Sequence, residues 1–285
     1  MKLRKWISVL LCMLLCVGML PTMAFAEDGT DTWDGTTDTE WYTANTEATE
    51  YHITTAEQLA GLAELVTGTV RNLTIGGSIV AEAYRGASYI GSITAYLAGG
   101  RIENCTSKTT IQLNGAAAST LGGIAGVAED AVIQNCVYEG QMQNNALSNS
   151  NYCGGICGYA LNSEVSYCAN IADLYGFDYI GGILGDAEDH VQISNCYNTG
   201  TLAFGERFSS SSHSPGAIGG IVARVYHGTT LSISSCYNAG VLEGIEQYPS
   251  DIGGIIGFTS SKKLIKTVEI IVLNRASLLS YRFRM

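Results

Sequence analysis

The chain has 285 residues, including 34 glycines and only three prolines, and a formal net charge of −11. Residues 27–261 hold 25 acidic and 6 basic side chains, a charge of −19, so nucleic acid and anionic membranes are excluded as favourable partners of this segment. The same acidity also keeps an extracellular protein in solution.

The N-terminus has the layout of a secretory signal peptide. Lys2, Arg4 and Lys5 form a positive head, an uncharged apolar run follows from Trp6 to Leu20, and Ala24–Phe25–Ala26 fits a small-x-small cleavage site. The alternative is a membrane anchor, but the run is shorter than the roughly 20 residues that a span needs. We therefore expect residues 1–26 to be removed, leaving a secreted chain with no stable membrane span.

Residues 27–67 form an acidic leader that is expected to end in a helix. Thr54 followed by Glu57 is a capping box. Apolar residues then recur at helical spacing, at Leu59, Leu62, Ala63 and Val66. Such a helix could cover the first rung of a repeat array, where an unpaired strand edge would otherwise be exposed.

Residues 68–261 contain a sequence motif that is repeated several times. It opens with an aliphatic residue, two glycines and another aliphatic, and a cysteine follows 14 to 17 residues after the first glycine. Successive first glycines are 31, 32, 27, 38 and 34 residues apart, so insertions fall in loops. The openings are Ile90-Gly91-Ser92-Ile93, Leu121-Gly122-Gly123-Ile124, Cys153-Gly154-Gly155-Ile156, Ile180-Gly181-Gly182-Ile183, Ile218-Gly219-Gly220-Ile221 and Ile252-Gly253-Gly254-Ile255.

Each unit holds short β-like runs between glycine and asparagine turns, and none is large enough to bury its own apolar face. Stacked units would close a continuous core, with each strand paired to its counterpart in the next rung. The sequence therefore predicts an all-β fold, a β-solenoid of about five to six rungs. The aliphatic residues on both sides of the glycine pair are expected to point inward.

The seven cysteines that follow the signal segment are interpreted as packing residues. Five of them share one repeat position, which favours a stacked column of buried free thiols; disulfides between adjacent rungs are the alternative. Cys153 and Cys157 stand where other repeats have aliphatic residues, so neither a metal site nor a cofactor is expected. The column comprises Cys105, Cys136, Cys168, Cys196 and Cys236.

The residues from Tyr179 to Leu202, with the pattern G-G-I-x-G and then I-x-N-C-Y-N-x-G, resemble the GLUG repeat. The units that open at Leu121 and Ile218 fit it well, and the resemblance covers about residues 88–258. GLUG repeats occur in bacterial cell-surface and adhesin-like proteins and in the non-catalytic repeat region of Gram-positive IgA metalloproteases. The resemblance implies a β-solenoid in an extracellular setting, and it does not imply an activity.

The C-terminal segment departs from the repeat. After Phe258 no Asn-Cys-Tyr-Asn follows, and residues 262–285 hold six basic residues and one acidic residue. We interpret this segment as an atypical basic and apolar tail, arising from a truncated or frame-shifted reading of a longer repeat protein. A genuine tail that contacts the membrane or the cell wall is the alternative.

The motifs of common enzymes are absent. The chain has no H-E-x-x-H, no G-x-S-x-G and no P-loop, and its four histidines are scattered, at His52, His190, His213 and His227. Glu129-Asp130 and Glu188-Asp189 recur at one repeat position, with Glu164 in the repeat between them. They are expected to form a solvated acidic edge, and the alternatives are calcium binding or a polysaccharide-cleaving site.

Tyrosines supply the candidate binding surface. Tyr89, Tyr152 and Tyr179 precede the inward aliphatic, so they should point outward, and Tyr138, Tyr197 and Tyr237 suggest a second column. Exposed aromatic rows can stack on sugars or anchor a protein, or they can simply support the cross-strand ladder.

The sequence thus predicts a non-enzymatic surface protein for adhesion or ligand presentation, with a host glycan, a host protein or a cell-wall polymer as partner. The alternatives are an accessory repeat fragment of a larger surface protease and a polysaccharide-acting β-helix.

Overall fold

The computed structural model describes residues 38–44, 68–83, 86–146, 150–205, 216–244, 251–260, 265–274 and 277–282. All of them belong to the second of two compact units, residues 37–285. The predicted signal peptide and the predicted helix over residues 54–66 lie outside the described residues. The leader contributes one short helix, α2 (Glu40–Thr43), where Asp38 Oδ1 accepts a hydrogen bond from the Glu40 backbone N–H.

The remaining described elements are strands, which form five stacks of parallel neighbours that we call sheets A to E. Sheet D contains β4 (Ser88–Gly91), β9 (Ser119–Gly122), β14 (Asn151–Gly154), β19 (Tyr179–Gly181), β24 (Ala217–Gly219) and β28 (Asp251–Gly253). Sheet E contains β5 (Thr94–Ala98), β10 (Ala125–Glu129), β15 (Cys157–Leu161), β20 (Leu184–Glu188), β25 (Val222–Val225) and β29 (Ile256–Thr259).

Sheet A contains β1 (Thr69–Arg71), β6 (Arg101–Glu103), β11 (Val132–Gln134), β16 (Glu164–Ser166), β21 (His190–Ser194) and β26 (Thr230–Asn238). Sheet B contains β2 (Thr74–Ile75), β7 (Thr106–Ser107), β12 (Val137–Tyr138), β17 (Ala169–Asn170) and β22 (Tyr197–Asn198), and is joined to sheet A through the long β26. Sheet C contains β3 (Ser78–Ala83), β8 (Thr110–Gly115), β13 (Gln141–Asn144), β18 (Asp173–Gly176), β23 (Leu202–Phe204) and β27 (Leu242–Glu243).

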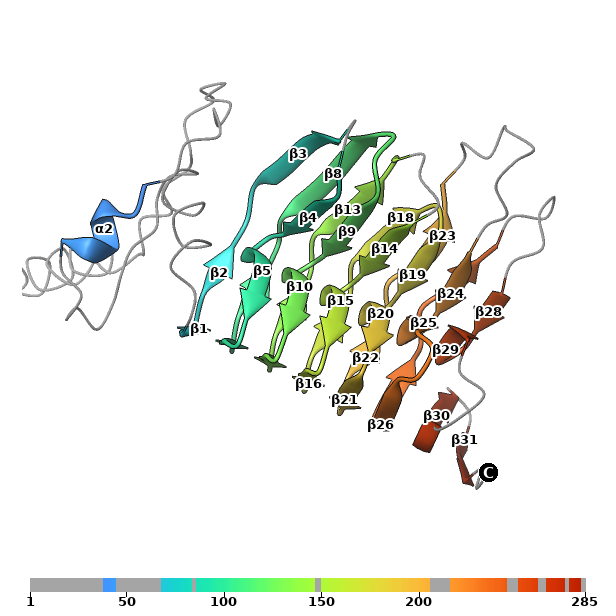
Figure 1. The fold of residues 1–285 in the computed structure, drawn as a ribbon. Coiled ribbons are helices and arrows are strands. Elements are labelled where there is room, and N and C mark those ends of the chain that lie inside the picture. Colours follow the sequence, from blue (N-terminus) through green and yellow to red (C-terminus); the bar gives the residue numbers. More distant parts are fainter. Residues whose placement is uncertain are drawn as a thin grey trace, which may run out of the picture. The chain divides into compact units, whose positions relative to one another are not determined.

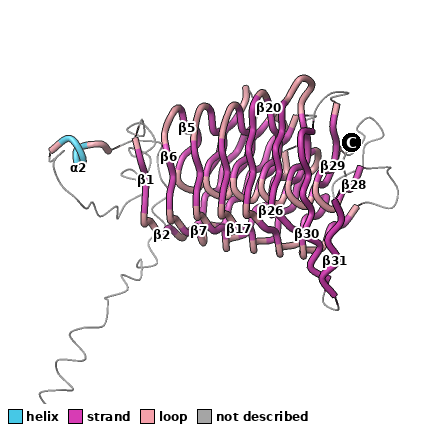
Figure 2. The backbone as a smooth tube through the Cα atoms, turned by 90° about the horizontal axis from the view of Figure 1, so that it is seen from below, coloured by secondary structure: helices cyan, strands magenta, loops and turns pink. Residues whose placement is uncertain are grey.

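The chain visits the sheets in the order D, E, A, B, C and then begins the next coil, which confirms the predicted β-solenoid. Coils 1 to 5 begin at β4, β9, β14, β19 and β24, preceded by β1–β3 and followed by β28 and β29. Figure 1 shows equivalent strands side by side in chain order, and Figure 2 shows the backbone winding through successive coils. Strands of adjacent coils therefore pair residues that are 27 to 40 positions apart in the sequence.

The core contains the aliphatic positions predicted from the glycine motif. Ile93, Ile124, Ile156, Ile183 and Ile221 are each at most 2% exposed. The preceding aliphatic column is also buried from Ile90 to Ile218, but Ile252 is 45% exposed. Ile252 is in register with the buried Ile218, and it is exposed because β28 is the edge strand of sheet D among the described residues.

The turns explain why asparagine and aspartate recur. Asn104, Asn135 and Asn195, between sheets A and B, have φ of 55°, 51° and 55°. Asp130 and Asp189, between sheets E and A, have φ of 50° and 59°. This left-handed conformation is disfavoured for most side chains, whereas asparagine and aspartate tolerate it.

A buried asparagine ladder explains the Asn of the Cys-Tyr-Asn motif. Asn170 Nδ2 donates to Asn198 Oδ1 at 2.6 Å, and Asn198 Nδ2 donates to Asn238 Oδ1 at 2.8 Å. Tyr138 occupies this buried column because it pairs with Asn170. The prediction that Tyr138 shares a column with Tyr197 and Tyr237 was therefore wrong. The residue of coil 2 in that column is Val137, which pairs with Ala169, which in turn pairs with Tyr197.

The glycines bring sheets D and E together on the side away from the core. Cys153 points into the core, so a Cβ on the next residue, Gly154, would point outward; it would lie 1.9 Å from the Cys157 carbonyl oxygen and 2.8 Å from the Gly185 nitrogen. Gly122, Gly181 and Gly219 are equally tight. The chain therefore bends sharply between the two strands, and their outer faces meet at a corner that we call the D–E corner.

The C-terminal strands continue sheet A. β30 (Ile265–Asn274) pairs in parallel with β26, with shifts of register, and β31 (Ser277–Arg282) pairs antiparallel with β30. The shifts agree with the loss of the repeat pattern after Phe258. Among the described residues no helix has the length and apolar character needed to cross a membrane.

Candidate functional site

The D–E corner carries an aromatic cluster around one arginine. Tyr152 of β14 and Tyr179 of β19 are in register, with ring centroids 5.4 Å apart and an interplanar angle of 19°. The Arg224 guanidinium carbon lies 4.6 Å from the Tyr152 ring centroid and 4.9 Å from that of Tyr179. Tyr226 adds a third ring at 5.3 Å. Cation–π attraction at these distances fixes the arginine among the rings.

A buried carboxylate neutralises that arginine. Arg224 Nε lies 3.0 Å from Asp186 Oδ1 and Arg224 Nη2 lies 2.6 Å from Asp186 Oδ2, a bidentate pair. Burial raises the pKa of Asp186, and Arg224 lowers it by a smaller amount. The resulting pKa is about 6, so this carboxyl is ionised at neutral pH. Burial lowers the pKa of Arg224, but the hydrogen bond with Asp186 outweighs it, so Arg224 stays charged. The pair thus adds no net charge among the three rings.

The three candidate tyrosines share one column but are not contiguous. Tyr89 pairs with Thr120, which pairs with Tyr152, so a threonine separates Tyr89 from the stacked pair. Tyr89 is 46% exposed and instead makes an edge contact with Tyr96, at 5.9 Å between centroids. Burial raises the pKa of Tyr152 to about 12, so this phenol is neutral.

Sequence reasoning missed Arg224 and Asp186. Both stand five residues after the first glycine of their repeats, and strands β20 and β25 place them side by side. The available signal was a pair of opposite charges at one repeat position in adjacent units.

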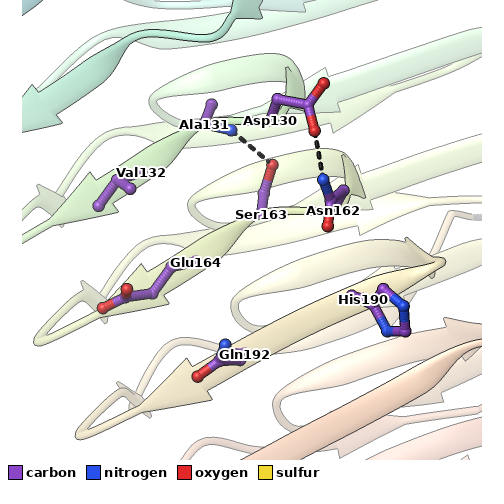
Figure 3. Close-up of a pocket in the computed structure, with 8 residues that line it drawn as sticks. All are labelled: Asp130, Ala131, Val132, Asn162, Ser163, Glu164, His190 and Gln192. Atoms are coloured by element: carbon purple, nitrogen blue, oxygen red, sulfur yellow. Dashed lines mark hydrogen bonds between the residues drawn. The ribbon is translucent and has the colours of Figure 1, made fainter.

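The acidic edge combines two turn residues, Asp130 and Asp189, with glutamates at strand ends. A shallow hollow of about 240 Å³ lies there (Figure 3). Asp130 accepts a hydrogen bond from Asn162 Nδ2, and Ser163 Oγ accepts one from the Ala131 N–H at 3.1 Å. Glu164 lies farther along its strand, and His190 lies on the next coil (Figure 3). The lining residues are Asp130, Ala131, Val132, Asn162, Ser163, Glu164, His190 and Gln192.

The two glutamates of the acidic pairs bind tyrosines. Tyr96 donates its hydroxyl proton to Glu129, and Tyr159 donates to Glu188, each across one coil. The hydrogen bond to Glu129 raises the pKa of Tyr96 to about 12. Glu129, Glu188 and Asp130 therefore serve cross-coil hydrogen bonds, and Asp189 serves a turn. Within the described ranges, no three His, Cys, Asp or Glu side chains gather as a metal site requires.

The cysteine column runs along the core. The backbone N–H of Cys136 points to Cys168 Sγ at 3.4 Å, and the same contact joins Cys168 to Cys196 and Cys196 to Cys236. All seven described cysteines are buried and unbridged. Cys153 and Cys157 lie in apolar columns, and burial raises the pKa of each thiol to about 12. These two thiols are protonated and enclosed, as packing residues are.

Known proteins offer limited similarity. No protein-family model matches the chain. It is 25% identical over 133 residues, 45% of its length, to halomucin of Haloquadratum walsbyi. A solved structure named as a putative immunoglobulin A1 protease from Bacteroides ovatus has 24% identity and a TM-score of 0.48, over 68% of this chain. The chain spans 1% of the length of halomucin and 60% of the solved chain.

Proposed function

We propose that this chain is a non-enzymatic, extracellular repeat module that presents its rigid outer faces to a ligand. The observation that carries the proposal is the D–E corner, where Tyr152 and Tyr179 stack on the outer face of the solenoid around Arg224. Aromatic side chains that hold one geometry lose little conformational entropy on binding and are frequent anchors of recognition surfaces. A host glycan, a host protein or a cell-wall polymer is the proposed partner.

Two further observations support a binding role without catalysis. Three of the five carboxylates that offered the best enzymatic site are engaged: Glu129 and Glu188 accept tyrosine hydroxyls, and Asp130 accepts the Asn162 amide. The predicted signal peptide and the GLUG resemblance both favour a secreted or surface location. The solenoid core is repetitive, whereas the outward aromatics differ from coil to coil, as expected of a scaffold that carries a specific surface.

The test is binding of the secreted chain to a glycan array and to extracellular matrix proteins. The Tyr152→Ala/Tyr179→Ala double variant should lose most of the signal, while its circular dichroism spectrum remains that of a β protein. Tyr89→Ala, a change in the same column but away from the stacked pair, is the matched control. Wild-type binding by the double variant would refute the role of the D–E corner.

A second candidate is a repeat segment of a much longer surface protein, such as a surface protease. The observation that favours it is the similarity to halomucin, since the matched region is 1% of that protein. Sequencing the reading frames downstream of this locus tests it; a catalytic domain in the repeat frame is the expected result.

A further inference from the structure

Tyr167 is an exposed aromatic residue in a conformation that disfavours it. It follows β16 with φ of 55°, and its side chain is 57% exposed. The equivalent turn position in the neighbouring coils is Asn135, Asn195 or Ser235. A bulky residue in the left-handed region is an outlier, and such strain persists where it serves a function. Folding alone would be better served by asparagine at this position.

Two more tyrosines lie just after the equivalent turns of the next two coils, in β22 and β26. Tyr197 and Tyr237 are in register, one coil apart, with ring centroids 5.2 Å apart and an interplanar angle of 6°. In coil 3 the residue that pairs with Tyr197 is Ala169, and Tyr167 lies two residues before Ala169 in the sequence. One coil step and two residue steps put the positions of Tyr167 and Tyr197 on the order of 8 Å apart.

The short segments that carry these three tyrosines are uncharged. The segments 166–171, 194–199 and 234–239 contain no Asp, Glu, Lys, Arg or His. Ser194 and Ser234 flank the tyrosines in the register of sheet A, and Ile171 is 43% exposed. The same face of coils 1 and 2 is charged: Lys108 Nζ lies 3.5 Å from Glu139 Oε2, and Arg101 pairs with Glu103. In coil 3 the exposed Glu164 continues the column of Arg101, and the uncharged segment begins two residues after it.

We propose that Tyr167, Tyr197 and Tyr237 form a binding surface for a neutral oligosaccharide. The apolar faces of sugar rings pack on aromatic rings, and sugar hydroxyls bond to hydroxyl and amide groups such as those of Ser194, Ser234 and Asn195. The three segments hold no basic residue and are bordered by Glu139 and Glu164, so the surface disfavours uronates, sulfates and phosphates. The inference rests on the proposed function as a binding module, but it places the ligand on sheets A and B and not at the D–E corner.

The test uses isothermal titration calorimetry of the secreted full chain with maltohexaose, cellohexaose and chitohexaose. Hexagalacturonate is the charged counterpart. We expect at least one neutral hexasaccharide to bind. Tyr167→Asn should weaken that binding at least tenfold while leaving the thermal midpoint unchanged or higher, because it removes both an aromatic contact and the backbone strain. Tyr197→Ala should also weaken it, and Tyr89→Asn, a matched exposed tyrosine on sheet D, should not.

Three results would overturn the inference: binding of no neutral hexasaccharide, wild-type affinity in Tyr167→Asn, or equal affinity for hexagalacturonate. Loss of binding only in Tyr152→Ala/Tyr179→Ala would overturn it and leave the proposed function standing. The same holds if the chain binds a protein partner and none of the sugars.

Discussion

Arg224 and Asp186 form a bidentate ion pair between adjacent coils, with Arg224 Nη2 2.6 Å from Asp186 Oδ2. The Asp186 side chain is fully buried, and that of Arg224 is 18% exposed. The pair holds coils 4 and 5 together at the D–E corner, where three tyrosine rings surround the guanidinium. Loss of one partner leaves a buried charge without compensation.

Arg224→Met should therefore destabilise the protein strongly at neutral pH. Removing one member of a buried pair costs about 3–5 kcal/mol, whereas replacing both members with apolar residues is often neutral. Urea unfolding should show a large loss for Arg224→Met and substantial recovery in Arg224→Met/Asp186→Leu. The loss should shrink at pH 5, because Asp186 can then take up a proton. Equal stability of the wild type and Arg224→Met would contradict this account.

Asp178 should make the protein more stable in mild acid. Its side chain is 5% exposed and accepts the Asn151 backbone N–H at 3.0 Å; burial raises its pKa from 3.8 to about 6. Because the folded-state pKa is the higher one, this contribution is complete below about pH 3.8 and is lost as the pH rises through about 6. The stability gained between pH 7 and pH 5 is on the order of 1 kcal/mol.

Thermal unfolding of the wild type and Asp178→Asn at both pH values checks this prediction. The asparagine keeps the acceptor oxygen but cannot ionise, so the gain at pH 5 should be smaller in the variant. The remaining gain in the variant reports Asp186 and the rest of the acidic surface. An identical pH response in both proteins would rule out a contribution from Asp178.

The cysteine column should consist of free thiols. Thiol titration of the secreted chain under denaturing, non-reducing conditions is expected to count seven thiols, and the folded protein should react with none of them, because all seven side chains are buried. Each disulfide between adjacent coils would lower the denatured count by two. A count of five or fewer would therefore support the disulfide alternative.

Gly154→Ala should disrupt the D–E corner. The added Cβ would lie 1.9 Å from the Cys157 carbonyl oxygen, a backbone atom that cannot move away alone. Overpacking of this kind costs about 1–3 kcal/mol or more. Gly254→Ala is the matched control from the same repeat motif, since a Cβ at that position would meet nothing within 4 Å. Differential scanning calorimetry should show a lower midpoint for Gly154→Ala only; similar midpoints would argue against the close approach.

Much of the fold could be predicted from the sequence because each repeat has the same residue types at the same positions. The glycine pair, its flanking isoleucines and the cysteine recur, so the inward columns followed directly, with Ile252 as the exception at a sheet edge. Tyr138 was misassigned because the tyrosine is the second residue after the cysteine in Cys136-Val137-Tyr138, whereas it is the first in Cys196-Tyr197-Asn198. Only the register of sheet B separates a buried tyrosine from exposed ones.

The candidate sites were less predictable. The Asp130 and Asp189 positions suggested chemistry, but their backbone φ values of 50° and 59° reveal turn residues. Tyr167 was overlooked because it interrupts an asparagine column, and the other interruption of that column, Ser235, is not aromatic. The amino-acid sequence by itself determined the solenoid and its core, because hydrophobic burial and pairing between rungs depend on residue types that repeat. Only the tertiary structure decided which side chains meet, because neighbours such as Asp186 and Arg224 lie 38 residues apart and are joined by the stacking of coils.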